Sequence, residues 1–187
     1  MKNRFVLVAV AVVVLAGAWW YWSGGASGPA AVPLVDHFAQ AEKRSSIAVE
    51  QAIRLEDVTI GSETRSAIFM HPTSRLTFKA ITIPRDAWLR VWVALKPDVW
   101  SRPEGNGVLF RFGVSDGRTY DELARQSVDP QHKEGDRRWI PIEVDLSPYA
   151  DLSVDLIFNT NSGLPGQGDD AANDWAVWGS PEIVVQR

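Results

Sequence analysis

The stretch Trp88-Leu-Arg-Val-Trp-Val-Ala-Leu95 (WLRVWVAL) decides the fold of this chain. Aliphatic residues occupy its odd positions, while Trp, Arg, Trp and Ala occupy the even ones. An alternation of period two gives a β-strand one continuous apolar face, which can cover a core on one side of a sheet. The stretch therefore predicts an antiparallel strand whose other face carries Trp88, Arg90 and Trp92.

The same alternation recurs on both sides of this stretch. Further runs of period two, and one candidate hairpin around Gly61 and Ser62, occupy residues 76–80, 108–114, 140–146, 152–158 and 58–70. Turn-forming residues such as Pro84-Arg85-Asp86 and Asp116-Gly117 separate them. About eight short strands with little helix predict an all-β fold, an antiparallel β-sandwich, and exclude a parallel α/β fold.

Two segments depart from the simple strand pattern. Residues 33–44 place Leu34, Val35 and Phe38 at near-helical spacing after a proline, which predicts one short helix. Pro141 lies inside the run 140–146, where it lacks an N–H for the ladder. This proline predicts an edge strand or a bulge.

The N-terminus carries an export signal. Lys2 and Arg4 precede an uncharged, largely apolar run over residues 5–22. Ala16-Gly17-Ala18 would suit cleavage of a signal peptide, whereas the aromatic cluster Trp19-Trp-Tyr-Trp22 suits the membrane–water interface of an uncleaved span. We favour a signal-anchor, a transmembrane helix that leaves the rest of the chain outside the cytoplasm, in the periplasm or at the cell surface.

The composition of the chain indicates its domain boundaries and excludes several classes of function. Residues 23–33 (SGGASGPAAVP) are typical of a flexible tether, so residues 34–187 form the expected sandwich domain. The chain has a net charge of −4, so it lacks the excess of positive charge that is typical of nucleic-acid-binding proteins. It has no cysteine, which excludes disulfides, thiolate zinc sites and cysteine nucleophiles.

The sequence offers no catalytic residue. His37, His71 and His132 lie far apart, without metal-ligand spacing, and the motifs of serine hydrolases, P-loop proteins and zinc proteases are absent. Carboxylate pairs, which a glycoside hydrolase needs, are too numerous to select one. A small exported glycoside hydrolase is therefore the least favoured alternative.

An acidic loop near the C-terminus is a candidate metal site. Asp169, Asp170, Asn173 and Asp174 supply three carboxylates and one amide, the hard oxygen donors that calcium prefers. The spacing is not that of an EF-hand. The alternative is an exposed polar loop in which Asp174 caps a turn before the last strand. Structural calcium is accordingly the one candidate cofactor.

The outward face of the deciding stretch is a candidate ligand platform. Trp88 and Trp92 flank Arg90, and flat rings with a cation between them could stack on sugar rings and bind their hydroxyls. The alternative is that both rings are covered, by residues 34–44 or by a loop, because Trp is highly buried on average.

The last third of the chain carries a family-like series of motifs. In order, these are Gly113-Val-Ser-Asp-Gly117, Asp136-Arg-Arg-Trp139, Ile142-Glu-Val-Asp-Leu-Ser-Pro-Tyr149, Leu156-Ile-Phe-Asn-Thr160 and Asp174-Trp-Ala-Val-Trp-Gly-Ser-Pro181. The series resembles exported bacterial jelly-roll domains related to galactose-binding-like and NPCBM-type carbohydrate-binding modules, over about residues 58–185. The resemblance implies a jelly-roll fold and, by analogy, structural calcium.

These observations favour a non-catalytic, envelope-anchored domain that binds carbohydrate. The alternative from another class is an envelope interaction or assembly subunit that binds a protein. The expected partners are a glycan or an envelope protein, together with the membrane through residues 5–22, and not nucleic acid.

Overall fold

The computed structural model describes residues 31–166, 168 and 170–185. The predicted signal-anchor over residues 1–22 and the tether up to residue 30 lie outside the described residues. Within the described ranges, no helix is both long and apolar enough to cross a membrane.

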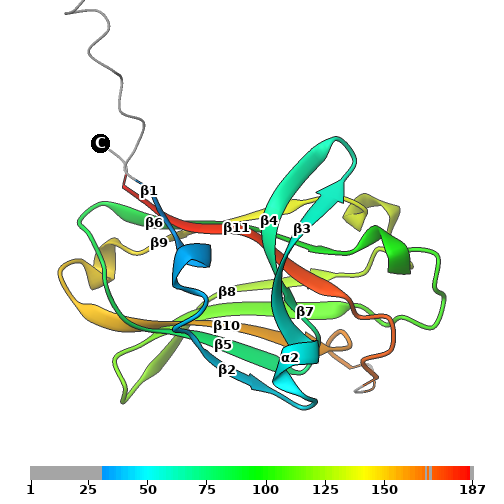
Figure 1. The fold of residues 1–187 in the computed structure, drawn as a ribbon, viewed down its shortest axis with the longest axis horizontal. Coiled ribbons are helices and arrows are strands. Elements are labelled where there is room, and N and C mark those ends of the chain that lie inside the picture. The colour runs from blue at the N-terminus through cyan, green and yellow to red at the C-terminus, as the bar shows by residue number, and fades with distance from the viewer. Residues whose placement is uncertain (1–30, 167, 169, 186–187) are drawn as a thin grey trace, which may run out of the picture. The chain divides into compact units, whose positions relative to one another are not determined.

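Two antiparallel sheets face each other and form a β-sandwich (Figure 1). The first sheet has the order β3 (Ile53–Ile60), β4 (Glu63–Met70), β11 (Ala176–Val185), β6 (Ala87–Leu95) and β9 (Ile140–Asp145), with β1 (Ala31–Pro33) also paired to β11. The second has the order β2 (Glu42–Ser45), β5 (Ser74–Thr82), β10 (Ser153–Ser162), β7 (Val108–Ser115) and β8 (Tyr120–Val128). The prediction of an all-β antiparallel sandwich is confirmed.

Helical structure is limited to single turns in the described part of the chain. They are α2 (Val49–Ala52) and the 3-10 turns η1 (Leu34–His37), η2 (Pro97–Val99), η3 (Glu134–Asp136) and η4 (Ser147–Tyr149). None of them is long enough to cover a sheet. The inner faces of both sheets lie on the core, and the outer face of the six-stranded sheet carries a second, smaller buried cluster that includes Phe69, Trp139 and Val177.

The core lies between the sheets and contains the apolar face predicted for the deciding stretch. Leu89, Val91 and Val93 of β6 are fully buried there. The Trp178 ring of β11 packs edge-on against Phe110 and Phe158 of the opposite sheet, with ring centroids 5.1 and 5.0 Å apart. Such pairs add stability beyond the area that they bury.

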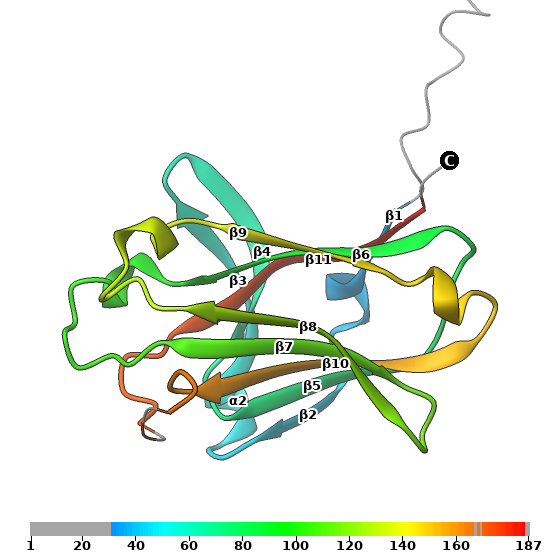
Figure 2. The same cartoon turned by 180° about the vertical axis from the view of Figure 1, so that it is seen from behind.

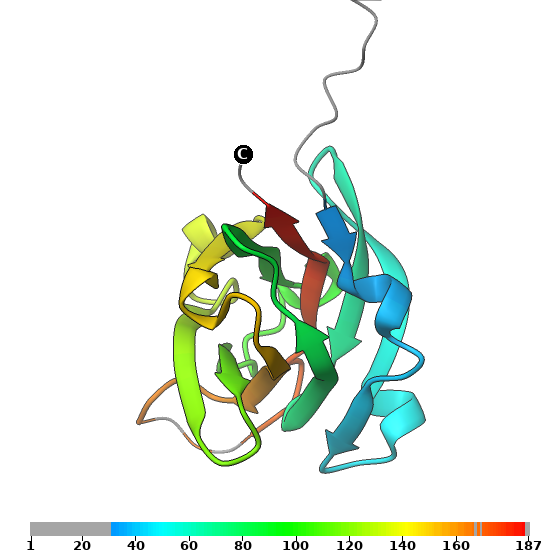
Figure 3. The same ribbon diagram turned by 90° about the vertical axis from the view of Figure 1, so that its left-hand side faces the viewer.

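Residues 31–45 differ from the expected tether and helix. The helical turn covers only Leu34–His37, and Glu42–Ser45 form strand β2 against β5. Leu34 is fully buried against the core, so packing on the sandwich, rather than local spacing, decides this segment. Ala31–Pro33 pair with β11, so three residues that the prediction assigned to the tether belong to the first sheet (Figure 3).

Pro141 lies where its chemistry requires. It belongs to β9, the edge strand next to β6, and its register partner is Trp92. The prediction of an edge position is confirmed, because an edge strand leaves one side of its ladder unpaired.

Three loops meet at one end of the sandwich (Figure 2). The register pairs Ser162 of β10 with Val108 of β7, and Val108 with Val128 of β8. Loops 96–107, 129–139 and 163–175 are therefore neighbours, and the Gly163 N–H donates to the Gly107 carbonyl at 3.0 Å.

Candidate functional site

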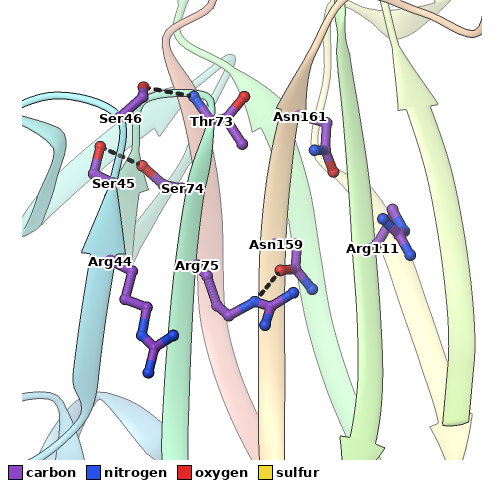
Figure 4. A pocket seen from close by; sticks show the side chains of 9 residues that line it. All are labelled: Arg44, Ser45, Ser46, Thr73, Ser74, Arg75, Arg111, Asn159 and Asn161. Atoms are coloured by element: carbon purple, nitrogen blue, oxygen red, sulfur yellow. Dashed lines mark hydrogen bonds between the residues drawn. The ribbon is translucent and has the colours of Figure 1, made fainter. Parts of the chain in front are cut away.

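Four arginines and one asparagine form a single row across the outer face of the five-stranded sheet. The register places them side by side, one from each strand, in the order Arg44, Arg75, Asn159, Arg111 and Arg125. Directly opposed residues in an antiparallel pair have Cβ atoms about 5 Å apart. The row, which we call the arginine row, therefore concentrates positive charge across the sheet, and Figure 4 shows all of its members except Arg125.

Two glutamates partly balance this charge from the neighbouring row. Glu122 accepts hydrogen bonds from Arg125 (2.8 Å) and Arg111 (2.5 Å), and together these hold its pKa below the ordinary value. Glu42 pairs with Arg44 at 2.5 Å. Like charges opposite each other in a sheet cost stability, and the two glutamates offset part of that cost.

The arginine row borders a surface hollow of about 320 Å³ near the end of β10. Its lining consists of polar or cationic side chains: Arg44, Ser45, Ser46, Thr73, Ser74, Arg75, Arg111, Asn159 and Asn161. The Nε of Arg75 donates to Oδ1 of the buried Asn159 at 2.8 Å. The Oδ1 of Asn161 is buried and has no hydrogen-bond partner in the part of the chain that the structure describes. The hollow thus presents donors and a free acceptor together.

An aromatic ring lies beside the arginine row. Tyr120 packs over Gly113 of β7 so closely that a Cβ at Gly113 would lie 2.5 Å from its ring. Its side chain is 37% exposed, and burial of the remainder raises the pKa of its hydroxyl. The charges of Arg111 and Glu122 also act on that pKa, in opposite directions, which places the ring next to the row. An exposed ring beside hydrogen-bonding groups is suited to stacking on a sugar.

The predicted platform of Trp88, Arg90 and Trp92 lies on the other sheet. All three residues point outward from β6 and are half-buried, as the alternation predicts. Arg90 is paired with Glu143 at 3.2 Å and with Glu182 at 3.7 Å. Its guanidinium is therefore held by protein carboxylates between the two rings.

One face of the Trp92 ring is covered by an arginine of β4, a strand separated from β6 by β11. The Arg65 guanidinium of β4 lies 3.6 Å from the centre of the Trp92 ring, a cation–π contact. Trp139 packs beside them over Gly179, where a Cβ would come within 2.8 Å of its ring. A pocket of about 370 Å³ remains at the edge of this cluster, beside the β3–β4 hairpin. No observation tests the platform as a ligand site, so it stays a prediction.

The predicted calcium residues differ in their exposure to solvent. Asp169 lies outside the described residues. Asp170 is exposed, and its Oδ1 accepts from the Ala172 N–H at 2.9 Å. Asn173 has a positive φ of 60°, and Asp174 is fully buried. No group of three or more His, Asp or Glu suited to a metal occurs within the described ranges.

Asp174 is nevertheless an unusual carboxylate. Neither of its oxygens has a hydrogen-bond partner among the described residues. Burial raises its pKa to about 7, and the charges of Asp170 and Asp129 add to this effect, while the nearby Gly163 N–H opposes it. A buried carboxylate without a partner is costly unless it is protonated or pairs with a cation.

Two amide oxygens at the same end of the sandwich are also buried without a hydrogen-bond partner among the described residues. Asn106 Oδ1 and Gln131 Oε1 are buried and unpartnered within the described ranges. Their amide nitrogens donate to the carbonyls of Gly168 (2.9 Å) and Asn173 (3.5 Å), so both residues belong to the loop end that holds Asp174. One carboxylate with amide and carbonyl oxygens is a donor set of the hard type that calcium takes.

Sequence reasoning missed the arginine row. Only Arg111 stands in a predicted strand, the alternating run 108–114, whereas Arg75 and Asn159 border predicted runs. Arg44 falls in the predicted helix, and Arg125 lies in no predicted strand. The row becomes visible only when the order β2-β5-β10-β7-β8 brings five distant segments into register. The available signal was an arginine or asparagine on the outward side of most of these strands.

The sequence is similar to part of a longer archaeal protein. No family model matches the chain. An uncharacterized protein of Archaeoglobus fulgidus is 39% identical over 129 residues, which are 66% of this chain and 32% of that protein. The chain thus spans about a third of the length of this relative.

Solved structures define the fold as galactose-binding-like. A CBM51 module from Clostridium perfringens GH95, solved in complex with methyl-galactose, has a TM-score of 0.50 at 13% identity over 83% of this chain and 100% of the module. A CBM61 module in complex with β-1,4-galactotriose has a TM-score of 0.51 at 11% identity, over 82% and 94% of the two chains. The K1 adhesin domain of Lys-gingipain from Porphyromonas gingivalis W83 has a TM-score of 0.53 at 12% identity, over 86% and 100%. The resemblance to carbohydrate-binding β-sandwich modules is confirmed at the level of fold.

Proposed function

We propose that this domain is a non-catalytic carbohydrate-binding module and that its ligand lies on the outer face of the five-stranded sheet. The observation that carries the proposal is the hollow of about 320 Å³ along the arginine row. Sugar hydroxyls both donate and accept hydrogen bonds, and the hollow offers guanidinium donors together with amide and hydroxyl groups.

Two further features support a saccharide. The exposed Tyr120 ring stands beside the row as a stacking surface. The fold is shared with modules solved in complex with methyl-galactose and galactotriose. A shared fold does not establish a shared ligand, so the proposal rests mainly on the polar hollow.

The alternatives from the sequence receive less support. No carboxylate lines the hollow, whereas glycoside hydrolysis requires two that converge on the ligand. The large apolar side chains that are exposed within the described ranges come from separate segments: Val32, Ile47, Leu55, Tyr120, Leu152 and Trp175. A protein-binding subunit would favour a contiguous apolar patch.

The proposal includes a location outside the cytoplasm, attached to a membrane through residues 5–22. This part rests on the sequence of residues 1–22 alone. Protease digestion of spheroplasts, compared with lysed cells, would test it: degradation in spheroplasts supports a domain outside the cytoplasm, and protection in them contradicts it.

The binding face can be tested with a glycan array probed by the full chain and by two variants. Asn161→Ala removes an unpartnered acceptor from the hollow, and Trp92→Ala removes a ring from the opposite sheet. We expect Asn161→Ala to weaken binding of every glycan that the wild type retains, and Trp92→Ala to leave binding unchanged. The reverse pattern would move the site to the predicted tryptophan platform. No retained glycan would overturn the proposal.

A further inference from the structure

We infer that the ligand of the arginine row is an anionic saccharide, one that bears carboxylate or sulfate groups. The inference rests on the proposed function and names its substrate class. It is carried by the charge of the hollow, whose lining includes Arg44, Arg75 and Arg111 and no acidic residue.

Arg75 is the centre of this charge. Its Nε is fixed by Asn159 at 2.8 Å, which is a neutral partner. Within the part of the chain that the structure describes, no carboxylate lies within 4 Å of its guanidinium, unlike those of Arg44, Arg111 and Arg125. A guanidinium presents paired N–H groups in one plane, which match a carboxylate or a sulfate. Arg75 is thus oriented by the protein and left without a counter-ion.

The charge of the row contrasts with the charge of the chain. The net charge is −4, and the two positive charges of residues 1–22 are not part of the sandwich, so the domain itself is more acidic still. The overall field of the domain therefore repels anions, so the attraction of an anionic ligand must come from the arginines of the row. A neutral glycan needs only hydrogen-bond donors, which uncharged side chains supply without the mutual repulsion of four arginines in one row, a repulsion that costs stability.

A polyanion of another class would need other features. Single-stranded nucleic acid is held by a series of aromatic rings along a basic groove. Among the described residues, Tyr120 is the exposed ring adjacent to the arginine row, and Glu42 and Glu122 neutralise part of its charge from the neighbouring row. Short local anionic groups on a saccharide fit this arrangement better than a continuous phosphate chain.

The test uses the full chain and two matched pairs of polysaccharides. Polygalacturonate is compared with its neutral, carboxyl-reduced form, and dextran sulfate with dextran, by affinity electrophoresis at about 0.15 M salt. We expect at least one anionic member to bind about tenfold or more tightly than its neutral partner.

A variant that adds a negative charge within the row gives a sharper test. Asn159→Asp keeps the acceptor for Arg75 and adds one negative charge at the centre of the row. Arg85→Gln removes one positive charge far from the row, where Arg85 pairs with Asp151 at 2.8 Å. We expect Asn159→Asp to abolish the anionic preference and Arg85→Gln to preserve it.

The outcomes separate the inference from the proposed function. Equal binding of the anionic and neutral members, or an anionic preference that survives Asn159→Asp, overturns the inference and leaves carbohydrate binding intact. Tighter binding to a 20-nucleotide single strand than to either anionic polysaccharide also overturns the inference. Failure to bind any of the four polysaccharides, together with an empty glycan array, overturns both.

Discussion

The Nε of Arg75 donates a 2.8 Å hydrogen bond to Oδ1 of Asn159, and this contact joins strands β5 and β10 at the centre of the proposed site. Asn159 is almost fully buried, although it belongs to the solvent face of the sheet. Its neighbours on both sides of the row are arginines, Arg75 and Arg111. Asn159 therefore separates two cations and orients one of them.

Replacing Asn159 with Ala should weaken both the sheet and the site. The variant loses a hydrogen bond to a charged group, so we expect a loss of about 1–3 kcal/mol in the free energy of unfolding, measured by urea denaturation. Glycan binding should fall as well, because Arg75 loses its orienting partner. Unchanged stability together with unchanged binding would contradict the role of this contact.

Replacing Glu122 with Gln should destabilise the domain by about 1 kcal/mol, because Arg111 and Arg125 would face each other without a counter-charge. Their contacts lower the pKa of Glu122 from its ordinary value of 4.5. Its contribution is therefore present above that pH and is lost as the pH falls through the lowered pKa. Denaturation curves at several pH values should show a gap between wild type and variant at neutral pH that closes in acid. A gap that is constant down to pH 2 would contradict this account.

Tyr120 should contribute its ring rather than its hydroxyl. We expect Tyr120→Ala to weaken glycan binding about 5- to 30-fold through loss of stacking, and Tyr120→Phe to retain most of the affinity. Isothermal titration calorimetry with an array-identified glycan would measure both. Equal losses in the two variants would assign the effect to the hydroxyl instead.

Trp92 should stabilise the fold without contacting the ligand. Trp92→Ala removes the ring on which Arg65 stacks at 3.6 Å, so we expect a loss of about 2–3 kcal/mol with glycan affinity unchanged. Thermal melting and calorimetry on the same sample would compare the two effects. Lost affinity with intact stability would support the platform of Trp88, Arg90 and Trp92 predicted from the sequence.

Asp174 allows the calcium hypothesis to be tested through stability. If the loop end takes calcium, the metal should raise the Tm of the wild type by several degrees at pH 7.5, EDTA should reverse this, and Asp174→Asn should respond to neither. A wild type that ignores both additions would contradict the hypothesis.

In EDTA, the raised pKa of Asp174 has its own consequence. The folded state keeps a proton on this carboxyl up to about pH 7, whereas the unfolded chain releases it near 3.8. Its effect on stability is therefore most favourable below pH 3.8 and is lost as the pH rises to about 7. The stability of Asp174→Asn relative to wild type should increase over this interval. A flat difference would indicate that the carboxyl titrates normally.

The strands were predictable because their signal is local. The alternation in residues 88–95 identified β6 and its buried face, and Pro141 limited its strand to an edge position or a bulge before any pairing was known. Residues 33–44 were misjudged as a helix, because Leu34 is buried by contacts with distant strands and Glu42–Ser45 pair with β5. Such contacts leave no periodic trace in a short segment.

The site was less predictable than the fold. Arg44 and Arg125 are 81 positions apart in the sequence and share one row only through the order of five strands. The tryptophans of β6 attracted the prediction because they flank Arg90 on one face of a single strand, yet Arg65, from a different strand, covers Trp92. A site formed by register cannot be read from any one strand.

One measurement tests the central claim most directly: an NMR titration of the chain, labelled with ¹⁵N at arginine and tryptophan, with a glycan that it binds. Binding on the five-stranded sheet predicts shifts in the Nε signals of Arg75 and Arg111, while the indole signals of Trp88 and Trp92 stay in place. Shifts confined to Trp88, Arg90 and Trp92 would contradict the account and place the ligand on the opposite sheet.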